Sequence, residues 1–251
     1  MTPSRHLSNL TPDTPNLPPE PPINCPPVLY KYTELKHAIA MVRHGAVRIG
    51  TMYDYRKEES HGAAIGDSGE GTKTTYIIGH GEEITSNEQL PEFLRGRTYI
   101  GKQLPSSFIP PPGGFVQCEK MILTGKLSLN LNCEDCYLFC TSAAFDLAIM
   151  DQFTGADACV QIHNPVPFLA AITCYITDKA QLFGVHACCY QDRQAEHTQD
   201  KGYHPALIKP VRYASQREWR AIWAPTSHPI QPFILPSPTL ARYCSLRWPR
   251  L

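Results

Sequence analysis

The spacing of apolar residues near the start of the chain predicts a helix between two strands. One helical face is formed by Leu35, Ala38, Ile39 and Val42. These positions follow the i, i+3, i+4, i+7 spacing, which places their side chains on one side of a helix. We expect Thr33 to cap this helix and Gly45 to end it. Residues 28–33, by composition, and residues 46–50, by alternation, predict the flanking strands.

Beyond this unit, short apolar runs alternate with polar and glycine- or proline-rich segments. We expect strands at residues 72–79, 99–103, 121–130, 137–142, 157–162, 174–177, 182–190 and 239–246. Short helices are expected at residues 87–94, 143–153 and 165–172, and loops at residues 53–72, 106–114 and 191–205. Many short strands with few short helices predict the α+β class, in a single domain that covers residues 28–251.

Residues 1–27 differ in composition from the rest of the chain, since nine of them are proline. Proline fixes φ and removes a backbone donor, and this segment has almost nothing apolar to bury. We therefore expect a disordered or polyproline tail. A solvated extension is the favoured interpretation, and docking of the tail into a partner is the alternative.

The overall charge does not indicate general electrostatic binding to nucleic acid, because 23 basic and 23 acidic residues give a formal net charge of zero. A local basic patch is the alternative. The sequence contains no run of eighteen apolar residues and no apolar signal-peptide core, so we expect no membrane span and a cytoplasmic protein. Ten cysteines are then expected to be reduced thiols.

The polar loop at residues 53–72 contains the glycine-rich run Gly66–Gly71. Glycines allow backbone amides to approach a ligand closely, so the loop is a candidate wall of a cleft; a flexible surface loop is the alternative. Its carboxylates are Glu58, Glu59, Asp67 and Glu70. Oxygen ligands suit hard cations, but the favoured interpretation is a solvated acidic loop.

The cysteines include one pair with the spacing of a zinc knuckle, Cys133 and Cys136, followed by Cys140. A second half-site is available only from distant residues, namely His186, Cys188 and Cys189. The incomplete ligand set makes structural zinc the less favoured interpretation. The histidines are scattered, and no nucleophile elbow accompanies them, so a hydrolase triad has little support.

Residues 213–223 alternate charged and apolar side chains at the period of a half-buried strand. In this interpretation Glu218 and Arg220 face one way, and Trp219 and Ile222 face the other. A partly buried carboxylate flanked by two arginines stays ionised through charge pairing. It is either a structural ion pair at a sheet edge or part of a functional site.

The order of several short segments resembles a family of uncharacterised bacterial and phage proteins. That family begins with a Leu-Tyr-Lys-Tyr type strand, has a Cys-Phe-Ser type strand in the middle, and ends with a Glu-Trp/Tyr-Arg strand. The matching segments here are Leu29–Thr33, Phe139–Ser142, Asp157–Ile162 and Gln216–Arg220. This resemblance brings no established activity with it.

The chain also resembles, more distantly, ADP-ribosyltransferases of the Arg–Ser–Glu type. Arg48 matches the early-strand arginine of that family, Cys140–Ser142 matches its serine motif, and Gln216–Glu218 matches its Gln/Glu-x-Glu motif. The chain departs from the family in the cysteine at position 140 and in the glycine-rich insertion after Arg48. In the His–Tyr–Glu type, Lys31 stands at the histidine position. The resemblance implies a split antiparallel or mixed β-sheet core with few short helices, and NAD as the substrate.

The resemblance also implies roles for the matching residues. Glu218 would stabilise the cationic ribose as nicotinamide leaves, Ser142 would orient it, and Gln216 would position an unknown protein or nucleic-acid acceptor. The residues expected to contact the dinucleotide are Lys31, Arg48, Tyr53, Tyr55 and Arg220. Among these, Arg48 would bind the pyrophosphate and a tyrosine would stack on nicotinamide.

An alternative function belongs to a different class: a non-catalytic interaction protein of a phage or mobile element, with a degenerate pocket. In that case Glu218 and Arg220 form an ion pair, and residues 1–27 or the basic C-terminus make the contacts. One structural feature separates the two functions, because the enzyme hypothesis requires Arg48, Ser142 and Glu218 to line a single cleft.

Overall fold

The computed structural model describes residues 23–57, 67–95, 97–105, 107 and 115–249. Strands predominate in it and the helices are few and short, which confirms the α+β class. The expected disordered tail lies outside the described residues from position 1 to position 22. No helix in the described part of the chain has both the length and the apolar character needed to cross a membrane.

The strands are β1 (Leu29–Thr33), β2 (Ala46–Thr51), β3 (Thr72–Ile84), β4 (Thr98–Ile100), β5 (Val116–Cys118), β6 (Met121–Asn132), β7 (Tyr137–Ser142), β8 (Ala158–Ile162), β9 (Ala180–Ala187), β10 (Cys189–Tyr190), β11 (Gln194–Glu196), β12 (Ile208–Lys209), β13 (Glu218–Pro225), β14 (Phe233–Pro236) and β15 (Cys244–Trp248). The α-helices are α1 (Leu35–His44), α2 (Met52–Tyr55), α4 (Leu147–Met150), α5 (Pro165–Tyr175) and α6 (Pro238–Ala241). The 3₁₀ helices are η1 (Asn87–Gln89), η2 (Glu92–Leu94), η3 (Pro205–Leu207) and η4 (Val211–Gln216).

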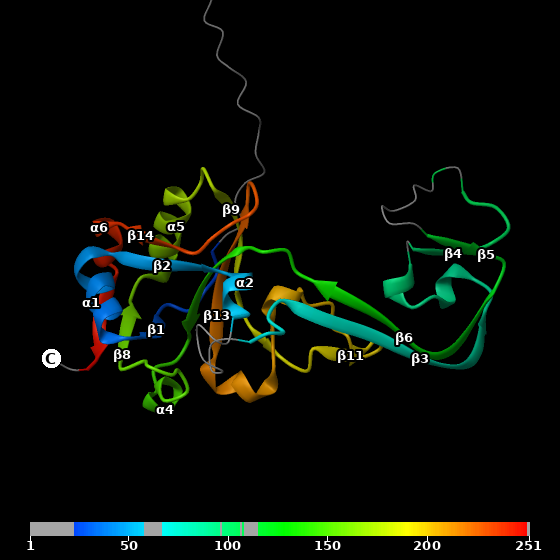
Figure 1. The fold of residues 1–251 in the computed structure, drawn as a ribbon, viewed down its shortest axis with the longest axis horizontal. Helices are drawn as coiled ribbons and strands as arrows, with labels where there is room; N and C mark the ends of the chain where they lie inside the picture. The colour runs from blue at the N-terminus through cyan, green and yellow to red at the C-terminus, as the bar shows by residue number, and fades with distance from the viewer. Residues whose placement is uncertain (1–22, 58–66, 96, 106, 108–114, 250–251) are drawn as a thin grey trace, which may run out of the picture.

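The central sheet divides at β7. One edge of β7 pairs along its whole length with β13, which in turn pairs with β9. The other edge is shared, because β2 pairs at Tyr137 and Leu138 whereas β1 pairs at Ser142. Strand β14 extends the β2 arm, and β8 and β15 extend the β1 arm (Figure 1). The residues of β7 between these two partners therefore lie beside an opening in the sheet.

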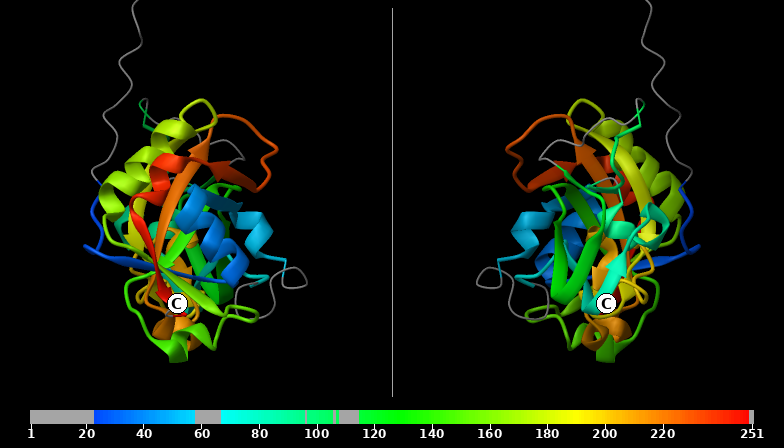
Figure 2. Two further views of the ribbon diagram at one scale, coloured as in Figure 1. Left: turned by 90° about the vertical axis from the view of Figure 1, so that its left-hand side faces the viewer. Right: turned by 90° about the vertical axis from the view of Figure 1, so that its right-hand side faces the viewer.

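The main core lies on one face of this sheet under α1, α5 and α6. Figure 2 shows α5 alongside β13. Trp223 of β13 is fully buried there and donates its indole N–H to Thr173 Oγ1 of α5 at 2.9 Å. Trp219, Ala221 and Trp223 face this core, which leaves alternate residues of β13 for the opposite face.

The expected facing of β13 is wrong at one residue. Ile222 packs in a second cluster with Met52 and Leu138, apart from the core that holds Trp219. A strand has a period of two residues, so position 222 shares the face of Glu218 and not the face of Trp219.

The β3–β6 hairpin forms an arm that leaves the central sheet (Figure 1). Its far end carries β4, β5, η1 and η2 around a small apolar cluster made by Ile84, Leu90, Ile100 and Leu123. Strand β11 pairs in parallel with β3 near the base of the arm. The interaction between β4 and β5 is also parallel, so the sheets of the chain are of both kinds.

The first strand–helix–strand unit follows the sequence pattern, with one correction. Gly45 ends α1 in the left-handed region at φ 63°, as expected. The N-cap residue is Glu34, not Thr33, and it makes no side-chain capping hydrogen bond. The Leu35 amide donates instead to the Asp157 carboxylate at 2.5 Å, so a residue distant in sequence satisfies the first turn of the helix.

Other expectations are wrong because tertiary contacts outweighed the local pattern. Residues 174–177 are not a strand, since α5 continues to Tyr175. The first part of the 213–223 tract is the helix η4, and Arg217 turns the chain at φ 45°, so the strand starts at Glu218. Within the loop expected at 53–72, α2 runs from Met52 to Tyr55, and Thr51 caps it by accepting from the Asp54 amide.

Candidate active-site pocket

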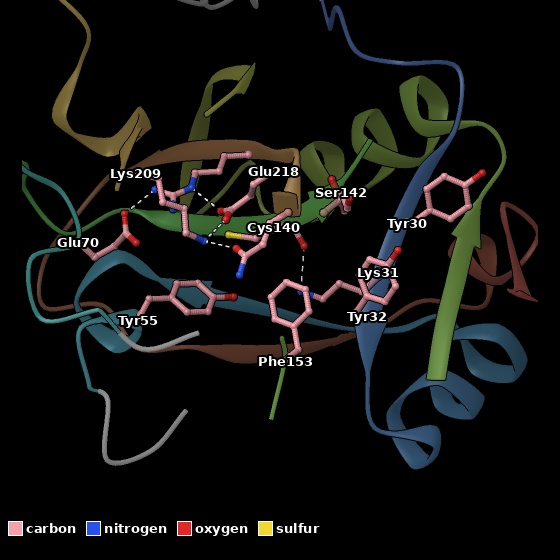
Figure 3. A pocket seen from close by; sticks show the side chains of 13 residues that line it. Tyr30, Lys31, Tyr32, Tyr55, Glu70, Cys140, Ser142, Phe153, Lys209 and Glu218 are labelled. Atoms are coloured by element: carbon pink, nitrogen blue, oxygen red, sulfur yellow. Dashed lines mark hydrogen bonds and ion pairs between the residues drawn. The ribbon is translucent and has the colours of Figure 1, made fainter. Parts of the chain in front are cut away.

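A pocket opens beside the split in the central sheet, on the face that carries Glu218 and Arg220 (Figure 3). Its cavity volume is about 70 Å³. The lining residues are Tyr30, Lys31, Tyr32, Tyr55, Glu70, Cys140, Thr141, Ser142, Phe153, Lys209, Gln216, Glu218 and Arg220. Segments far apart in the sequence therefore meet here, from β1, α2, β7, β12 and β13 and from the end of the glycine-rich loop.

Four buried charged residues form a continuous network at the base of the pocket. Lys209 Nζ binds Glu218 Oε2, and Arg220 Nε donates to Glu218 Oε1 at 2.6 Å. Arg220 Nη1 donates to Glu70 Oε1 at 2.7 Å. No member of the network is more than 7% exposed. Two cations balance two carboxylates, which is the condition under which buried charges are tolerated.

The network holds Glu218 in its ionised form. Burial alone opposes ionisation, but Arg220 and Lys209 outweigh it and hold the pKa of the Glu218 carboxyl far below its usual range. The pKa of Lys209 is raised, since the Glu218 carboxylate outweighs the burial of the ammonium group. The pKa of Arg220 is likewise raised in spite of its burial. Glu218 is thus a fixed negative charge and not a proton donor.

Neutral groups complete the hydrogen bonding around the network. Gln216 Oε1 accepts from Lys209 Nζ at 2.8 Å, and the Ala206 carbonyl accepts from Arg220 Nη1 at 2.6 Å. The backbone N–H of Glu218 donates to the Tyr190 hydroxyl at 2.5 Å. Side chains held by several partners keep one geometry, which suits a preorganised site.

Lys31 occupies the opening in the sheet. Its Nζ donates to the Cys140 carbonyl at 2.9 Å, in the part of β7 that lies between the β1 and β2 partners. The same ammonium lies 5.4 Å from the Phe139 ring centroid. Burial lowers the pKa of Lys31. Lys31 thus satisfies a β7 carbonyl and places an amine at the pocket wall.

Aromatic rings form the rest of the wall. The Tyr32 ring stacks on Phe153 with a centroid separation of 5.7 Å. Tyr30 and Tyr55 complete the aromatic lining (Figure 3). Burial raises the pKa of Tyr55, so its hydroxyl stays protonated and remains a hydrogen-bond donor. Flat rings beside fixed charges suit a ligand with both a planar ring and polar groups.

The structure brings most of the expected site residues into this pocket. Those that line it are Lys31, Tyr55, Ser142, Gln216, Glu218 and Arg220. Ser142 lies directly opposite Glu218 in the β7–β13 register. The Ser142 hydroxyl, however, donates to the Ala144 carbonyl at 3.0 Å, so Lys209 and Arg220 are the groups that orient Glu218.

Arg48 and Tyr53 lie outside the pocket, so Arg48 does not line a single cleft with Ser142 and Glu218 as the enzyme hypothesis requires. Arg48 lines an adjoining hollow of about 230 Å³, which shares Lys31, Tyr32, Tyr55 and Phe153 with the pocket. Its Nη2 donates to Asp54 Oδ2 at 2.5 Å, and its side chain is 44% exposed. Tyr53 lies elsewhere: its ring packs against the Arg56 guanidinium at 4.2 Å and is 39% exposed.

Sequence reasoning missed Glu70 and Lys209 as members of the site. Glu70 was expected in a solvated acidic loop, and this is wrong, because Glu70 is 2% exposed and bound to Arg220. Asp67 of the same loop is also buried, with Arg193 donating to its two oxygens at 3.0 and 2.6 Å. Glu58 and Glu59 lie outside the described residues. The available signal was the run of glycines, which lets the loop fold back against β13.

All ten cysteines belong to the described part of the chain, and all are free thiols, as expected. Within that part, no cluster of three or more histidine, cysteine, aspartate or glutamate side chains is arranged to hold a metal ion. Burial raises the pKa of the Cys140 thiol in the pocket to about 12, so this thiol is neutral at physiological pH.

No protein-family model matches the chain, and comparisons with curated proteins and with solved structures likewise find no match. The function must therefore be inferred from the chemistry of the pocket. A fixed carboxylate beside cationic donors and aromatic rings is able to stabilise a developing positive charge on a bound ligand.

Proposed function

We propose that this protein binds NAD at the pocket and transfers ADP-ribose to an acceptor that is not yet known. The observation that carries the proposal is the meeting of the second and third motifs of the ADP-ribosyltransferase resemblance. Ser142 and Glu218 lie opposite each other in adjacent strands, and Gln216 lies in the same buried network. A sheet that divides beside this pair supports the same interpretation.

The size of the pocket limits which part of NAD it takes. A cavity of about 70 Å³ has room for roughly five water molecules, at about 10–15 Å³ each on the same measure. That space suits one ring and not a dinucleotide. The ribose, which Glu218 must contact, is assigned to the pocket. The nicotinamide ring and the diphosphate are assigned to the adjoining hollow, which shares Tyr55 and Phe153 with the pocket and is lined by Lys31 and by the Asp54-paired Arg48.

The chemistry follows from the fixed charge of Glu218. Cleavage of the nicotinamide–ribose bond develops positive charge on the ribose, and an ionised carboxylate stabilises that charge. Each Glu218 oxygen accepts one cationic donor, from Lys209 or from Arg220, and a carboxylate oxygen has two lone pairs. One acceptor position per oxygen thus serves the ribose hydroxyls. Gln216 holds Lys209 in place beside Glu218, and Tyr55 packs against the nicotinamide.

Calorimetric titration of the full chain with NAD tests the binding step. Phe153→Ala removes an aromatic wall, and we expect it to weaken NAD binding by roughly tenfold, as the loss of about 1–2 kcal/mol of ring packing implies. The matched control is Phe183→Ala, because Phe183 is 49% exposed and does not line the pocket. Lys31→Met, with exposed Lys36→Met as its control, tests the cationic contact in the same way.

Two outcomes would contradict the proposal. Wild-type chain that releases no heat with NAD at millimolar concentration would exclude the ligand class. Equal weakening by Phe153→Ala and Phe183→Ala would show that any binding occurs away from the pocket. Circular dichroism of each variant establishes that the fold is retained before the titrations are compared.

A second candidate function, association between copies of the chain, is favoured by the exposed arm. The leucine row of β6 consists of Leu127, Leu129 and Leu131, which alternate with polar residues and so share one face. Leu127 and Leu131 are 40% and 38% exposed. In the described part of the chain, β6 pairs only with β3, so its other edge presents unpaired backbone groups.

The sequence of β6 is self-complementary in an antiparallel pairing centred on Leu129. In this register Leu127 lies opposite the partner's Leu131, and Lys126 lies opposite the partner's Asn132. No two like charges meet, so a two-fold symmetric dimer fits the edge. Leu129→Lys would place two lysines directly opposite each other, whereas Asn130→Lys would place lysine opposite serine.

Light scattering during size-exclusion chromatography distinguishes the outcomes. We expect a dimer for the wild type and for Asn130→Lys, and a monomer for Leu129→Lys. A wild-type monomer at protein concentrations near 100 micromolar, or a dimer that survives Leu129→Lys, would contradict association through β6.

A further inference from the structure

Cys133 and Cys136 lie in the short connection between β6 and β7, and backbone hydrogen bonds fix both residues. The Cys133 amide donates to the Gly71 carbonyl at 2.8 Å, and the Cys136 carbonyl accepts from the Met52 amide at 2.9 Å. Cys136 belongs to the apolar cluster that includes Met52, and Cys133 packs against that cluster. Cys133 Sγ donates to the Glu134 carbonyl at 3.1 Å, and its proximity to Cys136 perturbs the pKa values of both thiols. With two residues between them in a Cys-x-x-Cys spacing, both side chains lie against the same apolar cluster.

The two thiols differ in exposure and in chemistry. Cys133 is half-buried, whereas Cys136 is 6% exposed. The neighbouring Cys136 thiol lowers the pKa of Cys133 in spite of its partial burial, and the Arg56 guanidinium lowers it further. The same proximity, with burial, raises the pKa of Cys136. An accessible thiolate backed by a buried thiol is the arrangement of an attacking and a resolving cysteine.

We propose that Cys133 and Cys136 form a thiol–disulfide exchange site whose substrate is a low-molecular-weight disulfide. The Cys133 thiolate attacks one sulfur of the substrate RS–SR, forming a Cys133–S–SR mixed disulfide and releasing RS⁻. The Cys136 thiol then loses its proton to water and attacks Cys133 Sγ. A Cys133–Cys136 disulfide forms and a second RS⁻ leaves. The chain loses two electrons and two protons, and the substrate disulfide is reduced to two thiols.

The first step favours the second. Once Cys133 is bonded to sulfur, it no longer carries the negative charge that opposed ionisation of Cys136. Cys136 then becomes the better nucleophile, and its position beside Cys133 makes the attack intramolecular. The mixed disulfide is therefore short-lived in the wild type and accumulates only when Cys136 is replaced.

Treatment of the reduced full chain with excess oxidised glutathione tests the site, with intact-mass measurement and peptide mapping as the readout. We expect the wild type to lose two hydrogens at Cys133–Cys136 without retaining glutathione. Cys136→Ser is expected to retain one glutathione on Cys133, and Cys136→Ala gives the same adduct should the serine variant misfold. The control is Cys174→Ser, because Cys174 is an exposed cysteine distant from the pair in sequence, and this variant should behave as the wild type does.

Three results would overturn the proposal. One is glutathione retained at Cys133 of the wild type, which would mean that Cys136 does not resolve the adduct. Another is modification of Cys174 with no reaction at Cys133. The third is stoichiometric zinc in the reduced chain that is lost in Cys133→Ser, which would make the pair part of a metal site.

Discussion

Neutralising Glu218 is expected to destabilise the fold strongly, because its charge is buried and paired on both sides. Glu218→Gln leaves Lys209 and Arg220 with Glu70 as the remaining carboxylate of the network, so the buried cluster changes from neutral to a charge of +1. Removing one partner of a buried ion pair costs about 3–5 kcal/mol. Glutamine keeps one acceptor oxygen, so we expect a loss of about 3 kcal/mol in the free energy of unfolding.

The matched control is the same substitution in an exposed ion pair. Glu83 lies 3.3 Å from Lys120, and the two side chains are 48% and 60% exposed. A pair of this kind contributes at most about 1 kcal/mol, so Glu83→Gln should leave stability nearly unchanged. Urea unfolding followed by tryptophan fluorescence measures both variants, since Trp219 and Trp223 lie on the strand that carries Glu218. A Glu218→Gln loss no larger than that of Glu83→Gln would refute the buried network as a stabilising element.

Three further predictions concern backbone, packing and pH. Gly45→Ala should lower the free energy of unfolding by several kcal/mol, because the added Cβ would lie 1.8 Å from the Ser237 backbone oxygen. Gly125 has a similar positive φ but open space around it, so Gly125→Ala should lower the free energy of unfolding by only about 1–2 kcal/mol. Thermal unfolding measures both variants. Thr173→Val should cost about 1–3 kcal/mol in urea unfolding by leaving the Trp223 indole N–H without its partner. The stability contributed by ionised Glu218 should be complete above the unfolded glutamate pKa of about 4.3. Below that pH it should fall by up to about 1.4 kcal/mol per pH unit. A stability difference between wild type and Glu218→Gln that does not shrink in acid would contradict this.

The first strand–helix–strand unit was predictable because its signals are local. The helical spacing that begins at Leu35 and the glycine at position 45 both act over a few residues. Strand β14 has no such signal, since its four residues, Phe233–Pro236, lie between prolines, and it becomes a strand only by pairing with β2. The 3₁₀ turn before β13 depends on Arg217 at positive φ, which non-glycine residues adopt only under tertiary constraint.

The candidate site was predictable only in part. Glu218 was evident from the charge pattern of one tract, and the family resemblance supplied Gln216 and Ser142. Glu70 and Lys209 were missed because their contact with β13 is set by how distant segments return to the sheet, which no local spacing encodes. The same limit explains why Arg48 lies outside the pocket in which it was expected: its side chain pairs with Asp54 and lines the neighbouring hollow.

Nicotinamide release from NAD tests the central proposal most directly, with wild type and Glu218→Gln compared at a temperature where both are folded. If Glu218 stabilises the cationic ribose, the variant should release nicotinamide at least about a hundredfold more slowly, the usual effect of removing one preorganised charge-stabilising group. Glu83→Gln should retain the wild-type rate. Equal rates of release from wild type and Glu218→Gln, or no release from either, would contradict the proposed function.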